Sequence, residues 1–387
     1  MAPWFSASAV APALATQWRL GPAGTAGLTV SVQLGFVAGA LVSAILTLSD
    51  MWSARRLVAA AAVAAALATV GVALSPSAAV GITFRFITGA ALACVYPPGM
   101  KIAAGWFREA RGWAIGLLVG ALTLGSAAPH LVRWLVPAGH WRAVLLVAAA
   151  SAFLGAMLVR LVPNDGPYAV PSPPFSWSAT PRILRDRAVM FANLGYLGHM
   201  WELYAMWTWM AAFVTASEMA RSVTESGADI RTRAALVTFS VVGSGAVGCW
   251  LGGKYADRFG RTTITSFAMA VSALCCVLAG WFFGKPLVAL VPLLLVWGVA
   301  VVADSAQFST AVSELAPPEY VGTALTLQTS LGFLLTTVTI SLLPLLASAV
   351  GWRWSMAALA PGPMLGVVAM QALRRRPEAV RLANGRR

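Results

Sequence analysis

Long uncharged apolar stretches recur along the whole chain and limit its possible folds more than any other feature. Residues 57–76 and 321–348 are two examples, and each is long enough to cross the hydrocarbon of a bilayer as a helix. Only 10% of the residues are charged, whereas soluble domains carry about 25%. Because a helix satisfies its own backbone groups inside a bilayer, the sequence predicts an all-α membrane protein.

Twelve membrane-spanning segments are expected, with boundaries good to about 2–4 residues. They cover residues 2–17, 23–48, 57–76, 79–104, 112–136, 140–162, 188–214, 234–254, 263–284, 286–312, 321–348 and 352–373. The longest polar gap is rich in Pro, Ser and Arg, and it divides the segments into two sets of six. The expected domains are an N-terminal six-helix half (1–162), a cytoplasmic central loop (163–187), a C-terminal six-helix half (188–373) and a basic cytoplasmic tail (374–387).

The first segment is unusually short for a membrane helix. Met1–Gln17 has no charged residue and would extend only about 25 Å as a helix, whereas the hydrocarbon core is about 30 Å thick. No basic region precedes it, which argues against a signal peptide. We expect a first helix that is truncated at its N-terminus, and a genuinely short first helix is the alternative.

The formal net charge of +14 raises the possibility of nucleic-acid binding, but the placement of the basic residues excludes it. Most lysines and arginines lie in the tail and in alternate connections between the expected segments, not in one domain or on one face. This is the pattern that orients membrane proteins, with the basic connections inside. It predicts a cytoplasmic C-terminus.

A polar gap between two apolar segments reads Asp257-Arg258-Phe259-Gly260-Arg261, with Gly253 four residues before Asp257. It resembles the signature loop Gly-x-x-x-Asp-Arg-x-Gly-Arg of the major facilitator superfamily. A degraded counterpart, Asp50 followed by Arg55, lies between the second and third segments. The resemblance implies a secondary transporter built from two parallel six-helix halves. It also implies a gating role for Asp50, Arg55, Asp257, Arg258, Gly260 and Arg261.

Other stretches extend the resemblance over nearly the whole chain. Residues 85–93 resemble a second superfamily motif, Arg-x-x-Gln-Gly-x-Gly-x-Ala, and the loop containing Glu314, Pro317 and Pro318 resembles another. Tyr96–Lys101 and His199–Trp209 resemble a bacterial branch related to cyanate and nitrate/nitrite permeases. This resemblance implies a monomeric, multi-pass protein of the bacterial inner membrane.

Arg85 is the best-matched charge within an expected span. Its guanidinium stays protonated and can hold a carboxylate or another oxyanion through two parallel hydrogen bonds. Arg85 is therefore a candidate for binding an anionic solute. The alternative is a structural arginine that donates to backbone carbonyls or extends towards the membrane surface.

The seventh segment holds the densest group of polar and aromatic residues. Tyr196, His199, Glu202 and Trp209 follow helical spacing and share one face. A carboxylate and an imidazole in a dry site suit proton transfer, so Glu202 is the first candidate for proton coupling. Tyr196, His199 and Trp209 are candidates for contacting the solute. The alternative is a hydrogen bond between His199 and Glu202 that only fastens this helix to a neighbour.

Three further polar residues interrupt the last apolar segments. Asp304 is the second candidate for proton coupling, and Gln307 and Gln328 are candidates for binding the solute. Structural hydrogen bonding among the three is the alternative. Separately, Ser244, Gly248 and Gly252 recur every four residues, which predicts a close helix–helix contact.

The leading hypothesis is a proton-coupled symporter that moves a small anionic solute by alternating access. The second hypothesis is a proton-driven exporter of a cationic or amphipathic compound, received by Trp201, Trp207 and Trp209. An enzyme is not expected, because the three histidines lie far apart and no nucleophile is paired with a base. No phosphate-binding loop occurs, and the four cysteines lack metal-ligand spacing, so no ATP, cofactor or metal is expected. A transporter-like sensor stays open as a fourth possibility.

Overall fold

Helices form all of the regular structure in the described part of the chain, and no strand occurs there. The computed structural model describes the chain except for residues 108–110, 138, 169–174, 223 and 387, and for the side chains of 49, 50, 111–113, 115 and 384. The prediction of an all-α protein is confirmed.

A first set of helices extends from residue 2 to residue 161. It comprises α1 (Ala2–Ala9), α2 (Ala11–Trp18), α3 (Pro22–Ile45), α4 (Leu48–Met51), α5 (Ala54–Leu74), α6 (Ala78–Ala93), α7 (Tyr96–Trp106), α8 (Arg111–Leu135) and α9 (Trp141–Leu161). The fourth expected segment is thus interrupted between α6 and α7. The reason is local: Pro97 and Pro98 follow directly, and proline lacks the N–H that would continue the earlier helix.

A second set begins after the central loop. It comprises α10 (Thr180–Arg185), α11 (Arg187–Arg221), α12 (Gly227–Phe259), α13 (Arg261–Phe282), α14 (Leu287–Ala303), α15 (Ser305–Leu315), α16 (Val321–Val350), α17 (Trp352–Ser355) and α18 (Pro361–Arg374), together with the 3-10 helices η1 (Pro318–Tyr320), η2 (Met356–Leu359) and η3 (Pro377–Gly385). The Asp186 side chain begins α11 by accepting hydrogen bonds from the N–H groups of Ala188 and Val189, at 2.9 and 3.0 Å.

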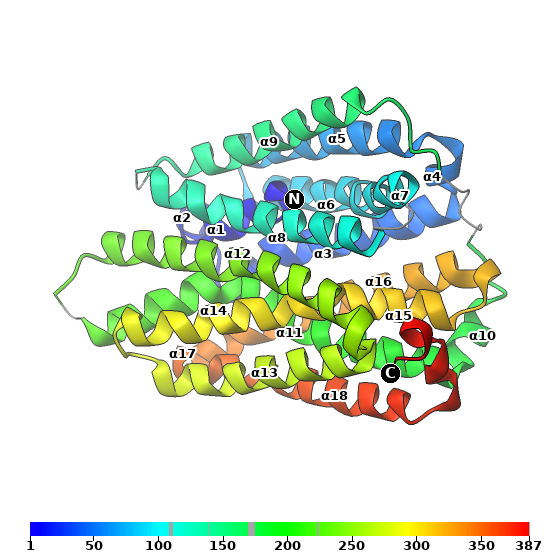
Figure 1. Cartoon of the computed structure of the whole chain (residues 1–387). Coiled ribbons are helices and arrows are strands. Elements are labelled where there is room, and N and C mark those ends of the chain that lie inside the picture. Colours follow the sequence, from blue (N-terminus) through cyan, green and yellow to red (C-terminus); the bar gives the residue numbers. More distant parts are fainter. Residues whose placement is uncertain (108–110, 138, 169–174, 223, 387) are drawn as a thin grey trace.

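The two sets lie against each other as two layers of the same bundle, the first in the upper part of Figure 1 and the second in the lower part. α3 packs on α6 of its own set and on α16 of the second, and α12 packs on α14 and on α8. These cross-set contacts define what we call the central interface. The end of the bundle that carries η3 is called the tail end below. The chain starts about midway along the bundle (Figure 1).

Nine stretches in the described chain are long and apolar enough to cross a membrane. The other three expected spans correspond to α1 with α2, to α8 and to α11. The first of these is not the single helix that we expected. It breaks at Val10 (φ −116°, ψ 14°) into two eight-residue helices, because Pro12 cannot donate a helical hydrogen bond and instead sits in the first turn of α2.

The contact predicted from small residues joins α12 to α14. A Cβ on Gly248 would overlap the carbonyl oxygen of Val299, and a Cβ on Gly252 would overlap that of Ala303. Ser244 Oγ donates to the carbonyl of Leu295 at 3.2 Å. Glycine is therefore required at these positions because the two backbones touch, as the spacing of the three residues predicts.

The carboxylate of Asp165 attaches the central loop to α5 of the first set. Asp165 accepts hydrogen bonds from the N–H groups of Ala54 and Arg55, at 2.8 and 3.0 Å, at the start of α5, where a negative charge is favourable. The Arg55 Nη1 donates to the carbonyl of Val162 at 2.9 Å. Arg55 thus holds the loop to α5, while the side chain of Asp50, in α4, lies outside the described residues.

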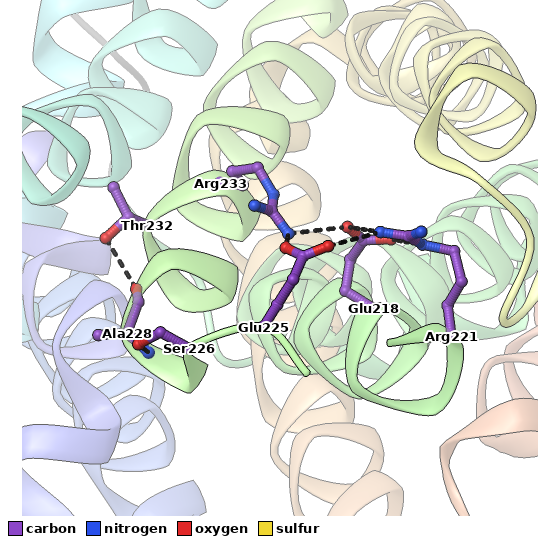
Figure 2. A network of polar contacts seen from close by, with 7 residues as sticks. All are labelled: Glu218, Arg221, Glu225, Ser226, Ala228, Thr232 and Arg233. Atoms are coloured by element: carbon purple, nitrogen blue, oxygen red, sulfur yellow. Dashed lines mark hydrogen bonds and ion pairs between the residues drawn. The ribbon is translucent and has the colours of Figure 1, made fainter. Parts of the chain in front are cut away.

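The connection between α11 and α12, at the end opposite the tail, is closed by four charged side chains (Figure 2). Glu218, which is 1% exposed, is ion-paired with Arg221 at 3.0 Å and with Arg233 at 3.3 Å. Glu225 pairs with the same two arginines. The hydrogen bond from Arg233 is the main reason why the pKa of Glu225 lies below its ordinary value. The network therefore fixes the end of α11 to the start of α12.

Acid should weaken this network. Because the pKa of Glu225 is lowered in the folded protein, its contribution to stability is present above the ordinary pKa of a glutamate, about 4.3, and is lost as the pH falls through the lowered value. Glu225→Gln should remove that acid-dependent part of the thermal stability. The measurement is the melting temperature between about pH 6 and pH 3, with the exposed Glu319→Gln as the control. Parallel pH profiles for wild type and Glu225→Gln would contradict the assignment.

Candidate functional site

Aromatic side chains from both sets meet in the middle of the central interface. Trp4 and Phe5 come from α1, Phe36 from α3, Tyr204 and Trp207 from α11, and Phe333 from α16. Measured between ring centroids, Phe36 lies 4.4 Å from Phe333, and Trp4 lies 5.0 Å from Phe36 and 5.6 Å from Tyr204. Phe5 contacts Trp207 at 5.5 Å. We call these six residues the central aromatic cluster.

Polar atoms without partners accompany the cluster. Within the described part of the chain, both amide atoms of Gln33 and the indole nitrogens of Trp4 and Trp207 are buried and have no hydrogen-bond partner. Gln33 is 0% exposed and precedes Phe36 by one turn, so it shares a face of α3 with the cluster. A buried polar group without a partner costs about 1–3 kcal/mol. Such groups call for an explanation, and a bound solute would provide one.

Glu202 sits in a pocket of neutral donors in the second set. Its Oε1 accepts hydrogen bonds from Ser272 Oγ at 2.6 Å, from Cys276 Sγ at 3.0 Å and from the indole of Trp297. The side chain is 2% exposed. Ser272 and Cys276 are one turn apart on α13, while Trp297 comes from α14. Among the described contacts, none of the partners of Glu202 is a cation.

His199 pairs with Asp304 rather than with Glu202. The Nδ1 of His199 lies 2.9 Å from Oδ1 of Asp304, and both side chains are almost fully buried. Asp304 sits at the break between α14 and α15. His199 and Glu202 are therefore not hydrogen-bonded to each other, in contrast to the alternative raised from the sequence. The seventh segment instead supplies two separate polar centres, one beside α13 and one at the α14–α15 break.

The remaining solute-binding candidates do not form one group. Tyr196 packs against Phe308, while the indole of Trp209 donates to the carbonyl of Ile340 at 2.9 Å. Gln328 donates to Asn193 at 3.0 Å. Gln307 accepts from Arg261 at 2.8 Å. The side chains of Asp304, Gln307 and Gln328 thus have three different partners. Side-chain hydrogen bonding among the three, which the sequence left open, does not occur among the described contacts.

Arg85 is fully buried, and backbone carbonyls surround its guanidinium. Its Nε donates to Leu28 at 2.9 Å, Nη1 donates to Pro3 at 2.6 Å and Nη2 donates to Trp4. These bonds tie α6 to α1 and α3. The contacts match the structural alternative raised from the sequence, since three of the five N–H groups of the guanidinium already donate to carbonyls.

Charged residues gather at the tail end, around the turn between α12 and α13. Gly260 has φ +93°, a conformation that residues with a Cβ rarely adopt. Arg261, next to it, donates to both oxygens of Glu314, at 2.6 and 2.8 Å. Asp257 lies 3.4 Å from Arg261, and the guanidinium of Arg258 lies over the ring of Phe259.

Comparison with known protein families shows to which family this chain belongs. The family model of the Major Facilitator Superfamily matches residues 1–340. The chain belongs to the major facilitator superfamily. No curated protein matches it. A branch shared with cyanate and nitrate/nitrite permeases stays a prediction.

Several solved structures share the superfamily fold with this chain. The nucleoside transporter NupG has a TM-score of 0.72 at 15% identity, covering 96% of each chain. An inward-facing, occupied bacterial homologue of the human lysosomal transporter Spinster has 0.72 at 15%, covering 97% of this chain and 93% of that one. The proton:xylose symporter XylE has 0.70 at 16%, covering 96% and 92%. At these identities the likeness establishes the fold alone, and membership of the superfamily points to a transporter rather than an enzyme.

Sequence reasoning missed part of the site. Gln33 is the one amide side chain in an uncharged span, the same kind of signal that singled out Gln307 and Gln328, so it could have been found. Ser272, Cys276 and Trp297 could not, because nothing in their neighbourhood along the chain distinguishes them from ordinary helix residues. Among the described residues, no group of three or more His, Cys, Asp or Glu could hold a metal ion.

Proposed function

We propose that this chain is a secondary transporter that moves a small solute by alternating access at the central interface. Two six-helix halves, 1–162 and 188–373, would tilt against each other, joined by the loop at 163–187. The observation that carries the proposal is the central aromatic cluster, where buried amide and indole groups without partners lie between the two sets of helices. A solute that enters when the halves separate would stack on the rings and satisfy these groups.

We place the protein in the bacterial cytoplasmic membrane with its C-terminus in the cytoplasm. The supporting observation is the distribution of lysine and arginine over alternate connections and the tail, which orients multi-spanning proteins. In this orientation the tail end of the bundle faces the cytoplasm. The chain is proposed to work as a monomer.

Glu202 is the proposed site of proton coupling. All three of its donors converge on Oε1, so Oε2 is the oxygen left to take up a proton. Neutral donors stabilise the carboxylate without fixing its charge, in contrast to a paired arginine. Tyr204 and Trp207 follow Glu202 on the same helix, so a change in the charge of Glu202 can be transmitted along α11 to the central aromatic cluster. Asp304, with His199, is the second candidate.

Of the two cargo classes raised by the sequence, the geometry supports the amphipathic compound better than the anion. The anion hypothesis depends on Arg85, whose three nitrogens already donate to carbonyls. The central aromatic cluster offers flat apolar surfaces with hydrogen-bonding groups at its edge, which suits a planar, amphipathic or cationic molecule.

The test uses purified protein. Its thermal stability is measured against a panel of small anions, planar neutral compounds and organic cations, and the stabilising compounds are then tested in proteoliposomes with an imposed proton gradient. A planar or cationic compound that stabilises wild type, but not Gln33→Leu, and accumulates with the gradient supports the proposal. If only anions stabilise the protein, and this stabilisation is lost in Arg85→Lys, the hypothesis of an anionic solute bound by Arg85 is supported instead. If no stabilising compound is transported, the remaining hypothesis is a transporter-like sensor that does not move solute.

Asp257→Asn should slow transport and leave the affinity for solute within a few-fold of wild type. Asp257 is 66% exposed and far from the central aromatic cluster, and its pairing with Arg261 at 3.4 Å is long, so the effect on rate should be moderate. Arg261→Gln should slow transport more, because it also breaks the two bonds to Glu314. The measurement compares transport rate with equilibrium binding. A collapse of binding with an intact transport cycle would show that these residues contact the solute instead.

A further inference from the structure

The side chain of Gln33 faces the first helix of the chain and the central aromatic cluster. On α3 it lies between two residues that contact α1. Thr29 Oγ1 lies 2.7 Å from Ser8 Oγ, and the ring of Phe36 lies 5.0 Å from that of Trp4. Residues 29, 33 and 36 follow helical spacing and share one side of α3. The amide of Gln33 is therefore directed towards α1, at the edge of the cluster.

Gln33 differs from the buried glutamines of the second set. Gln307 accepts from Arg261, and Gln328 donates to Asn193, so each fastens its own helix to another. Neither Oε1 nor Nε2 of Gln33 has a hydrogen-bond partner among the described contacts, although the side chain is 0% exposed. A structural bond thus accounts for Gln307 and Gln328, but not for Gln33.

Two indole N–H groups add donors near the same rings. The indole nitrogens of Trp4 and Trp207 are buried without a partner in the described part of the chain. Measured between centroids, both rings lie close to Tyr204, at 5.6 and 5.7 Å. An indole can only donate, whereas a carboxamide carries an accepting oxygen beside a donating nitrogen. The cluster thus offers one acceptor and several donors, and Gln33 presents both kinds side by side.

This set of groups distinguishes between classes of solute. An anion provides only acceptors, so it would place its negative charge beside Oε1 of Gln33. A cation without an acceptor would leave Nε2 and the indoles unpaired, which is costly for buried groups. An uncharged cyclic amide carries C=O beside N–H and can form two parallel hydrogen bonds with Gln33. Glutamine pairs in this way with the adjacent donor and acceptor of a planar heterocycle.

We propose that Gln33 selects an uncharged, planar cyclic amide or imide as the solute. The edge that carries C=O and N–H pairs with the carboxamide of Gln33, and the faces of the ring stack on the central aromatic cluster. The second carbonyl of an imide accepts from an indole. The inference rests on the proposed transport function for access to this buried site. It narrows the planar class of solute to one edge chemistry and makes Gln33 the residue that determines specificity.

The experiment measures binding of bicyclic compounds of similar size to the purified protein by isothermal titration calorimetry. 2-Quinolone carries the C=O and N–H edge, and N-methyl-2-quinolone lacks the N–H. 1-Naphthoate represents the anions and N-methylquinolinium the cations. We expect 2-quinolone to bind most tightly, and methylation of its nitrogen to lower the affinity about tenfold or more, because Oε1 of Gln33 then stays unpaired.

Variants of Gln33 test which side chain reads the edge. Gln33→Leu should abolish the preference for 2-quinolone over its N-methyl derivative. Gln33→Glu should shift the preference towards protonated 2-aminoquinoline, which carries two donors on one edge. Gln371→Leu is the matched control, since Gln371 donates to Ser266 at 2.8 Å and lies on α18, which packs on α11 and α13 of the second set. It should bind as wild type does.

Three results would overturn the inference: no binding of 2-quinolone, equal affinity for 2-quinolone and its N-methyl derivative, or a preference that is unchanged in both Gln33 variants. Failure of the inference and failure of the proposed function are distinguishable. A different compound that accumulates in proteoliposomes, while 2-quinolone does not bind, keeps the transporter and refutes the role of Gln33. Binding of 2-quinolone that depends on Gln33, without transport of any compound, supports the site and refutes the transporter.

Discussion

Glu202→Gln should abolish proton-driven accumulation of the solute and leave counterflow exchange intact. Glutamine keeps the shape of the side chain, and its carbonyl oxygen can still accept from Ser272, Cys276 and Trp297, so the fold should be preserved. What is lost is the group that takes up the proton. Exchange of solute for solute needs no net proton movement, so it should continue. In the variant, the ratio of solute inside to outside should fall to that of passive equilibration.

The measurement is accumulation in proteoliposomes with and without a proton uncoupler, in parallel with counterflow. Glu319→Gln, an exposed carboxylate in η1, is the matched control and should behave as wild type. If accumulation by wild type is indifferent both to the uncoupler and to Glu202→Gln, proton coupling at this residue is excluded. The protein would then be a uniporter or exchanger with a structural glutamate.

Arg85→Leu should destabilise the protein by about 3 kcal/mol or more, because each hydrogen bond to a charged group contributes about 1.5–3 kcal/mol. The guanidinium donates to carbonyls of Pro3, Trp4 and Leu28, and leucine leaves these buried acceptors without their donor. Arg85→Lys should recover only part of the stability, since an ammonium lacks the planar fork of the guanidinium. The readout is the midpoint of thermal or denaturant unfolding in detergent.

Arg142→Leu is the matched control for the removal of an arginine. Arg142 is exposed and donates one bond, from Nε to the carbonyl of Ala73 at 3.1 Å, so its replacement should lower the stability far less. The pair of Arg85 variants also separates structure from binding. An Arg85→Lys protein as stable as wild type, but without stabilisation by anions, would identify Arg85 as a solute-binding residue.

The sequence alone predicted the features that depend on local chemistry. Apolar length located nine stretches that are long and apolar enough to span a membrane in the described chain. The spacing of Ser244, Gly248 and Gly252 predicted the contact with α14, and the residues around Gly260 indicated the superfamily. The break at Val10 was missed, although Pro12 carried the signal. Proline in the first turn of a new helix and proline inside a continuous helix look alike until the backbone is known.

The partners of the buried polar residues could not be predicted. Glu202 meets residues 70 to 95 positions away, and Arg85 meets carbonyls, which every residue carries. Helical spacing places two side chains on the same face, but it does not say which neighbouring helix that face meets. His199 and Glu202 share a face and still pair with different elements, because the long α11 passes several helices in turn.

The residues proposed for proton coupling, Glu202 and Asp304 with His199, all lie in the second set of helices, whereas the buried charge of the first set, Arg85, is held by backbone carbonyls. If the two halves work as proposed, energy input is encoded by the second half of the gene, whereas recognition draws on both halves, with Gln33, Trp4 and Phe36 supplied by the first. Substitutions in the first half could then retune which molecule is carried without disturbing the proton site. Among relatives of this protein, a change of cargo with a constant driving ion would be the easier evolutionary step.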